Sequence, residues 1–270
     1  MMKLLLKHLY CMPWLLFMLL GIGYAAHPAD SEFAVSVPGP RAQAIEPALD
    51  HPLRNPSLCL APDGYYYLTG TTGSPDWDLT NDGIRLWRST DLIHWETLGK
   101  IWDIDEHGTW QRTFKPQQLR GRTVNARAVW GPEIHWSGQA FFIVYAMNYG
   151  GIGLLKSRSD QAQGPYEDLG CLVERGHCPS LFWDRDNAVY LLYNHGHIVR
   201  LTQDLKATDG LPQVIGSIDS GPANPMATVS PPGTPTDFML TFVNWKYLLF
   251  WNQNSARFGH YTDDVFAAQS

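Results

Sequence analysis

Two carboxylates and two imidazoles stand out because they lie in short motifs that also contain proline. Glu133 and His135 belong to the run WGPEIHW at 130–136, and His177 and Asp219 each lie shortly before a proline. A carboxylate or an imidazole that is held against a reacting group can donate or accept a proton, so these side chains are candidates for general acid–base catalysis. In the structural alternative, Glu133 accepts hydrogen bonds from an arginine or a backbone amide and only holds its strand in place.

Tryptophan is the second informative residue type. The chain contains 11 Trp, and aromatic residues make up 13% of it. Indole rings offer flat faces on which sugar rings can stack, but they also fill the cores of β proteins. Both interpretations apply to each of the stacking candidates, which are Trp77, Trp110, Trp130 and Trp245.

His177 and Cys178 are neighbours in the sequence, which raises the question of a metal site. Adjacent residues of a β-strand point to opposite faces, and no second ligand pair has the spacing of a zinc site. We therefore predict no metal site here. His195 and His197 are two residues apart, so on a strand they would share one face, where they could line a site or cap a turn.

The elements that position these residues follow a repeating pattern. Each copy has two apolar strands followed by turn residues, and the first two copies continue into an outer aromatic segment. The copies cover 65–70, 84–89 and 91–96; 141–145, 153–159 and 164–168; 188–193, 197–202 and 204–205; and 238–242 with 260–269. Strands with period-2 patterning that recur at about 50 to 75 residues are typical of propeller blades. We predict an all-β fold in which about four blades are visible.

The beginning of the chain reads as a targeting segment. Lys3 and Lys7 precede an apolar stretch that ends near Ala26, and Gly23-Tyr24-Ala25 has the form of a signal-peptidase site. The alternative is an uncleaved membrane anchor with an apolar core near the lower limit for spanning. We expect a signal peptide at 1–26, a polar Pro-rich lead at 27–48, and one propeller domain at 49–270. The protein is then secreted or periplasmic, with no membrane association after cleavage.

Charge and cysteine content narrow the range of partners. The net charge of −6 becomes −8 without the two lysines of the signal peptide, and no basic run is present. Such a chain is a poor ligand for nucleic acids or anionic membranes. Beyond the signal peptide the cysteines are Cys59, Cys171 and Cys178, so at most one internal disulfide is possible, and Cys171 with Cys178 is the nearest pair.

Five motifs carry a resemblance to a known family. They read RNPS at 54–57, LWRSTDLIHW at 86–95, WGPE at 130–133, GPY at 164–166 and PSLF at 179–182. Together they resemble glycoside hydrolase family 43 over most of the chain. The resemblance implies a five-bladed propeller that hydrolyses arabinose- or xylose-containing glycans with inversion at the anomeric carbon. It also allows a calcium ion in the central channel, since some members of the family bind one there.

The three carboxylates on which the resemblance places the chemistry are substituted in this chain. The base, an Asp of an Arg-Asp-Pro motif, is replaced by Asn55, and the tuning Asp is replaced by Cys178. The acid, a Glu of a Glu-Gly-Pro motif, is replaced by Ser220, with Asp219 one position away. An amide cannot accept a proton from water at neutral pH, and a thiol with an ordinary pKa of about 8.5 is a poor substitute for a carboxylate.

Two hypotheses of function follow for a polysaccharide or oligosaccharide partner. The chain is a family 43 glycosidase with a rearranged site, in which Glu133 and Asp219, with His177 or His135, transfer the protons. Alternatively it is a non-catalytic carbohydrate-binding propeller, a pseudoenzyme. The side chains that we expect to contact the sugar are Arg54, Trp77, Trp130, His177 and Trp245.

The last repeat ends at residue 270, where the earlier copies still have a turn and an outer strand to come. An open ring would leave two unpaired edges. We therefore expect an incomplete propeller, either an inactive fragment of a longer protein or a short ring that the segment 46–60 completes.

Overall fold

The computed structural model describes residue 49 and the ranges 51–73, 81–114, 116–119, 122–125, 127–148, 150–215, 235–243, 246–257 and 260–269. The expected signal peptide and the polar lead lie outside these ranges. So do four of the candidate site residues, which are Trp77, Asp219, Ser220 and Trp245.

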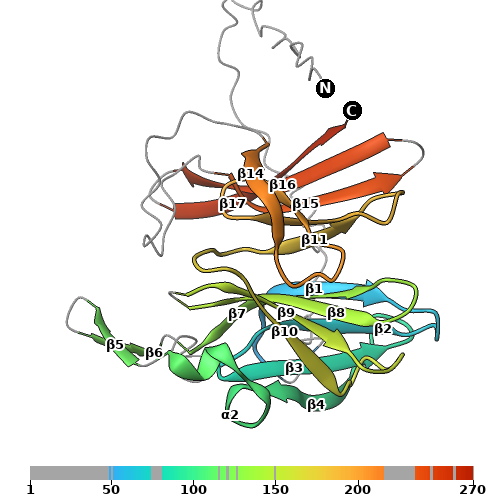
Figure 1. The fold of residues 1–270 in the computed structure, drawn as a ribbon, viewed down its shortest axis with the longest axis vertical. Helices are drawn as coiled ribbons and strands as arrows, with labels where there is room; N and C mark the ends of the chain where they lie inside the picture. The colour runs from blue at the N-terminus through green and yellow to red at the C-terminus, as the bar shows by residue number, and fades with distance from the viewer. Residues whose placement is uncertain are drawn as a thin grey trace, which may run out of the picture. The chain divides into compact units, whose positions relative to one another are not determined.

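Antiparallel sheets dominate the described chain, which confirms the predicted all-β class (Figure 1). The first sheet has the order β1-β2-β3-β4, with β1 at Arg54–Leu60, β2 at Tyr66–Thr71, β3 at Gly83–Ser89 and β4 at Glu96–Asp103. The second contains β7 at Val129–Trp136, β8 at Phe141–Met147, β9 at Ile152–Ser157 and β10 at Tyr166–Val173. The third contains β11 at Ser180–Trp183, β12 at Val189–Tyr193, β13 at His197–Leu201 and β14 at Thr208–Val214.

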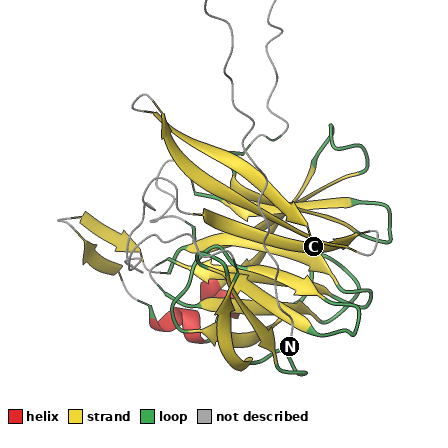
Figure 2. Ribbon diagram, turned by 90° about the horizontal axis from the view of Figure 1, so that it is seen from above, coloured by secondary structure: helices red, strands yellow, loops and turns green. Residues whose placement is uncertain are grey.

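A three-stranded sheet and a hairpin complete the strands. The sheet contains β15 at Pro235–Val243, β16 at Lys246–Arg257 and β17 at His260–Gln269, and the hairpin pairs β5 at Pro116–Leu119 with β6 at Arg122–Asn125. In every sheet the strands follow one another in chain order, so each sheet is a meander. The described helices are the short α2 at Ile104–His107 and a 3-10 turn at Trp110–Thr113 (Figure 2). Within the described ranges, no helix has the length and apolar character needed to cross a bilayer.

The sequence repeat located the second and third strands of the four-stranded sheets but missed their first strands, β1, β7 and β11, and also missed β16. The outer strand expected at 91–96 begins only at Glu96. The expected strands at 65–70, 84–89 and 141–145 coincide closely with β2, β3 and β8. β16 escaped notice because its second half, Asn252-Gln253-Asn254-Ser255, is polar. Residues 54–60, which one expectation used to close a short ring, instead pair with β2 as the first strand of the first sheet.

The core consists of apolar layers between successive sheets, and β8 contributes to two of them. All seven residues of β8 are buried. Phe141, Ile143, Tyr145 and Met147 pack with residues of the first sheet such as Ile84, Leu86 and Trp102. Phe142, Val144 and Ala146 pack with residues of the third sheet such as Leu181, Leu191 and Val199. Because each large apolar side chain contributes about 1.5–3 kcal/mol when it is fully buried, these layers hold the sheets together.

A long connection from the first sheet to the second is anchored by one buried glutamine. Gln111 is fully buried. Its Nε2 donates to Asp168 Oδ2 at 2.9 Å and also contacts the hydroxyl of Tyr145. Thr109 Oγ1 donates to the same Asp168 oxygen at 2.7 Å. The connection is therefore fixed on the second sheet before it continues into the β5–β6 hairpin.

Candidate functional site

Three sheets begin with the same unusual backbone. Asn55, Gly131 and Cys178 have φ values of 47°, 51° and 50°, and each immediately precedes a proline. The left-handed region costs an ordinary L-residue about 1–2 kcal/mol, and asparagine tolerates it better than most residues. The repetition at the first strands of three sheets shows that the fold imposes this conformation, whichever side chain occupies it.

This backbone interrupts the regular pairing at the starts of β1 and β7. The β1–β2 register shifts between Arg54 and Ser57, and the β7–β8 register shifts between Trp130 and Glu133. Bulges of this kind change the direction of a side chain relative to the alternation of the strand. They explain why strand alternation alone could not predict where these residues point.

Contacts between β1 and β7 join the first two sheets at this end. The guanidinium of Arg54 lies 5.1 Å from the ring centroid of Trp130. The Ile134 N–H donates to Ser57 Oγ at 3.1 Å. One face of the Trp130 ring is therefore occupied by a cation, and this pair presents a guanidinium and an aromatic ring together rather than a bare stacking platform.

Glu133 lies between the second and third sheets. Ser180 Oγ donates to Glu133 Oε1 at 3.2 Å, and His135 Nε2 is 3.4 Å from Glu133 Oε2. Both side chains are only 19% exposed. The ring of His135 also packs on Trp183, with ring centroids 5.2 Å apart. The carboxylate thus accepts a hydrogen bond from a hydroxyl and lies close to an imidazole, where the structural alternative expected an arginine or a backbone amide.

His177 and Cys178 precede β11 and do not lie on a strand. His177 Nδ1 is 3.3 Å from Cys178 Sγ, so the expectation that adjacent residues point apart was wrong at this position. The left-handed backbone of Cys178 turns both side chains to the same side. The His177 N–H donates to Asn194 Oδ1 at 2.9 Å, and the Asn194 N–H donates to the His177 carbonyl at 2.8 Å.

The two other histidines of this region lie close by. His195 is in the turn between β12 and β13, and its ring packs against that of His177 at 5.1 Å in an edge arrangement. His197 begins β13 and packs against Tyr193 at 5.2 Å. Burial lowers the pKa of His197, and the neighbouring His195 lowers it further. The expectation that His195 and His197 share one strand face does not hold, because only His197 belongs to the strand.

Comparison with known proteins identifies the fold. The sequence model of glycosyl hydrolases family 43 matches residues 45–226. The chain belongs to this family. No curated protein matches the chain. Among solved structures, the family 43 protein BlXynB from Bacillus licheniformis is similar, with a TM-score of 0.59 and 20% identity over 83% of this chain and 40% of that chain.

Two further solved structures are matched over most of their own length. An endo-arabinase from Bacteroides thetaiotaomicron has a TM-score of 0.57 and 20% identity over 81% of this chain and 75% of that chain. An arabinanase from Bacillus subtilis has a TM-score of 0.58 and 20% identity over 82% of this chain and 73% of that chain. The family resemblance inferred from the motifs is thus confirmed, and this chain spans less than half of BlXynB.

Two of the substituted family positions lie among the described residues. Asn55 and Cys178 stand where the resemblance places two of the three carboxylates, and both have a left-handed backbone. Glu133 lies on β7, which contacts β1 directly and reaches β11 through Ser180. The sequence places Ser57 and Ser180 in the motifs RNPS and PSLF without indicating a role for either hydroxyl. Both serines directly follow a proline in the sequence, and this shared position could have indicated their shared role, which is to hydrogen-bond to β7.

The family allows a calcium ion, and the described residues can be checked for a cluster of acidic ligands. Calcium takes six to eight oxygen ligands, mostly from carboxylates and carbonyls. Across the described ranges, no group of three or more His, Cys, Asp or Glu side chains is placed to hold a metal ion.

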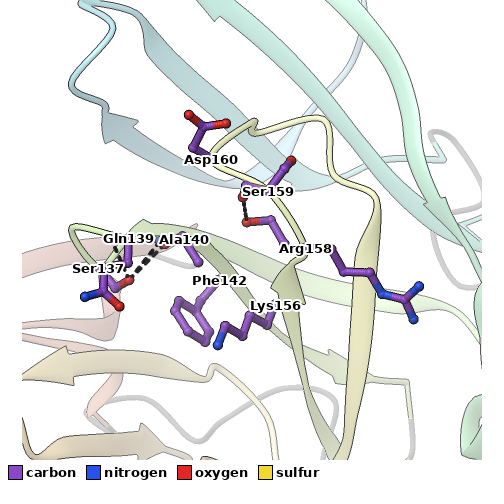
Figure 3. Close-up of a pocket in the computed structure, with 9 residues that line it drawn as sticks. Ser137, Gln139, Ala140, Phe142, Lys156, Arg158, Ser159 and Asp160 are labelled. Atoms are coloured by element: carbon purple, nitrogen blue, oxygen red, sulfur yellow. Dashed lines mark hydrogen bonds between the residues drawn. The ribbon is translucent and has the colours of Figure 1, made fainter.

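A separate hollow lies at the opposite end of β7, where the β7–β8 and β9–β10 turns meet (Figure 3). Its volume is about 320 Å³, and its lining includes Ser137, Gln139, Lys156 and Ser159. Lys156 extends beside the ring of Phe142, with 5.8 Å between Nζ and the ring centroid (Figure 3). The guanidinium of Arg158 points away from the Phe142 ring (Figure 3). This hollow does not include any of the substituted family positions.

Proposed function

We propose that this chain is a carbohydrate-binding member of family 43 that has lost hydrolysis, and that its ligand is a polysaccharide with arabinose or xylose units. One observation carries the proposal. Asn55 and Cys178 share one left-handed backbone with Gly131 at the starts of three sheets, yet neither offers a carboxylate. The backbone of these strand starts is regular while two of the groups needed for proton transfer are replaced.

The chemistry supports binding over hydrolysis. Inverting hydrolysis needs a carboxylate base that activates water and a carboxylic acid that protonates the leaving oxygen. The amide of Asn55 can accept and donate hydrogen bonds to sugar hydroxyls, but it cannot take the proton of water. Arg54 and Trp130 add donors and an aromatic edge beside it. Binding sites of this kind need few polar groups with fixed orientation and no tuned pKa.

The sugar class comes from the relatives. Two of the solved structures are an endo-arabinase and an arabinanase, and a conserved fold with an altered site can retain the ligand class while it changes the outcome. We also propose that the protein acts outside the cytoplasm after the segment 1–26 is removed. The mass of the protein recovered from a secreting host tests this, because retention of all 270 residues would contradict it.

A second candidate function rests on the Glu133–His135 pair. A carboxylate next to an imidazole between two sheets could transfer protons if a sugar reached it. The hydrogen bond from Ser180 favours a structural role instead, because it joins β7 to β11. Glu133→Gln separates the two, since removing a general acid or base lowers turnover by about 10²–10⁴-fold.

The first experiment measures binding and hydrolysis on the same folded sample. Affinity electrophoresis or calorimetry with arabinan and arabinoxylan measures binding, with cellulose as the control polymer, and aryl arabinosides and aryl xylosides report hydrolysis. We expect binding to the pentose polymers without sugar release. Release that Glu133→Gln abolishes would support the second candidate, and absence of binding to any pentose polymer would overturn the proposal.

A restoration experiment addresses the lost chemistry directly. The triple variant Asn55→Asp, Cys178→Asp and Ser220→Glu returns a carboxylate to each family position. We expect it to hydrolyse aryl pentosides above the background of the unmodified chain. The matched control is Asn55→Gln, Cys178→Ser and Ser220→Gln, which changes the same positions without adding a carboxylate and should remain inactive.

A further inference from the structure

The surroundings of the three described cysteines differ sharply. Burial raises the pKa of Cys59, and burial also raises the pKa of Cys171 although its residue is exposed overall. The thiol of Cys171 donates to the Val173 carbonyl at 3.1 Å, which holds it as a thiol. Cys178 is the only one of the three for which the structure records an imidazole contact, with 3.3 Å between Sγ and His177 Nδ1.

The backbone fixes the geometry of this pair. The left-handed conformation of Cys178 brings its side chain to that of the preceding residue. Two hydrogen bonds between the backbone of His177 and Asn194 hold the histidine from the opposite side. The ring of His195 packs on the ring of His177 and limits its rotation. The sulfur and the imidazole nitrogen are therefore held together before any reaction.

A thiol that can pass its proton to an adjacent imidazole reacts as a thiolate. Cys178 is half-buried as a residue. We propose that Cys178 is a thiol–disulfide exchange site that accepts small organic disulfides, with His177 as the proton acceptor. This inference does not depend on glycan binding.

The reaction balances without a further oxidant. The Cys178 proton moves to the imidazole of His177, and the thiolate attacks one sulfur of the incoming disulfide. A new S–S bond forms between Cys178 and that sulfur while the original S–S bond breaks. The second sulfur leaves as a thiolate with the bonding electron pair and takes the proton held by His177.

The groups that surround the pair determine how its reactivity depends on pH. The ring of His195 packs against the ring of His177. The rings of Tyr193, at the end of β12, and His197, at the start of β13, pack against each other. Glu133 reaches Ser180, two residues after the cysteine. An isolated thiol slows about tenfold for each pH unit below its pKa of about 8.5, whereas a thiol paired with imidazole stays reactive toward the ordinary histidine pKa of about 6.5.

The experiment treats the folded full chain with dithiodipyridine, a neutral disulfide, and maps the labelled cysteines by mass spectrometry. We expect Cys178 to react at least tenfold faster than Cys171 at pH 7, although Cys171 is the more exposed residue. We also expect the advantage to grow as the pH falls toward 6. Equal rates for the two thiols in the unmodified protein would overturn the proposal, and this comparison needs no variant.

Variants then assign the role of the histidine. The background is a variant in which every cysteine except Cys178 is replaced by serine. In it, His177→Asn keeps a polar group but removes the proton acceptor. We expect its rate at pH 7 to fall about tenfold and its pH profile to become that of an ordinary thiol. His195→Asn, which leaves His177 in place, is the control and should retain the reactive profile. An unchanged rate and profile in a folded His177→Asn variant would contradict a role for His177.

Discussion

The starts of β1 and β11 have the same backbone and different chemistry. Asn55-Pro56-Ser57 and Cys178-Pro179-Ser180 each begin with a left-handed residue, continue with proline, and end with a serine whose hydroxyl bonds to β7. At β1 the left-handed residue is an exposed amide. At β11 it is a thiol beside two histidines. The fold therefore fixes the position of these residues, and their chemical nature is free to differ.

Ser57 and Ser180 both hydrogen-bond to β7, but one hydroxyl accepts and the other donates. Ser57 accepts a hydrogen bond from the Ile134 backbone, whereas Ser180 donates one to the Glu133 carboxylate. The loss of an acceptor for a buried backbone N–H costs more than the loss of one donor to a carboxylate that water can still reach. Substitution of the two serines should therefore lower the free energy of unfolding by different amounts.

The largest effect is expected for Ser57→Ala. The variant leaves the Ile134 N–H without its hydroxyl partner, which costs about 1–3 kcal/mol. Ser180→Ala should cost less, because the Glu133 side chain is 19% exposed and water can replace the lost donor. Urea unfolding of both variants measures the difference. Equal costs would show that the two serines are equivalent despite their opposite hydrogen-bond directions.

The next effect concerns the third strand start, where the left-handed residue is glycine. A Cβ added at Gly131 would meet no atom within 4 Å, so steric contact does not penalise it. Gly131→Ala should still destabilise the fold by about 1–2 kcal/mol, because alanine disfavours this φ. The measurement is the free energy of unfolding. A neutral result would mean that the backbone relaxes out of the left-handed region.

A smaller effect is expected when the two chemistries are exchanged. Asparagine tolerates the left-handed region better than cysteine, so Cys178→Asn should stabilise the protein by a few tenths of a kcal/mol and Asn55→Cys should destabilise it similarly. Thermal unfolding of each single variant and of the exchanged pair measures this. A loss above about 2 kcal/mol in the pair would show that side-chain contacts, rather than the backbone, select these residues.

The smallest effect is a pH dependence that belongs to the β11 region. The lowered pKa of His197 means that the unfolded chain binds its proton more tightly than the folded chain. The contribution of this group to stability is therefore present above pH 6.5, the ordinary histidine value, and is lost as the pH falls below it. His197→Gln should flatten the slope of stability between about pH 6.5 and 5. An unchanged slope would assign that dependence to other groups.

Part of this structure could be predicted from the sequence. The apolar runs with period-2 patterning indicated the class and the second and third strands of the four-stranded sheets, and the motifs around Trp130 and Pro179 indicated the family. The site was harder, because the left-handed residues at Asn55 and Cys178 break the alternation on which strand reasoning depends. For the same reason the contact of His177 with Cys178 was missed. The hydrogen bond between Ser180 and Glu133 joins residues 47 positions apart, and no local pattern encodes it.

The double burial of β8 also constrains how this protein can change in evolution. Its odd-numbered residues, such as Ile143 and Tyr145, belong to one apolar layer and its even-numbered residues, such as Val144, to another. Insertion or deletion of a single residue would turn every side chain to the other layer at once. Insertions and deletions within β8 should therefore not be tolerated. New sequence can instead enter the connection at 104–128, where a change in length need not shift the register of any blade.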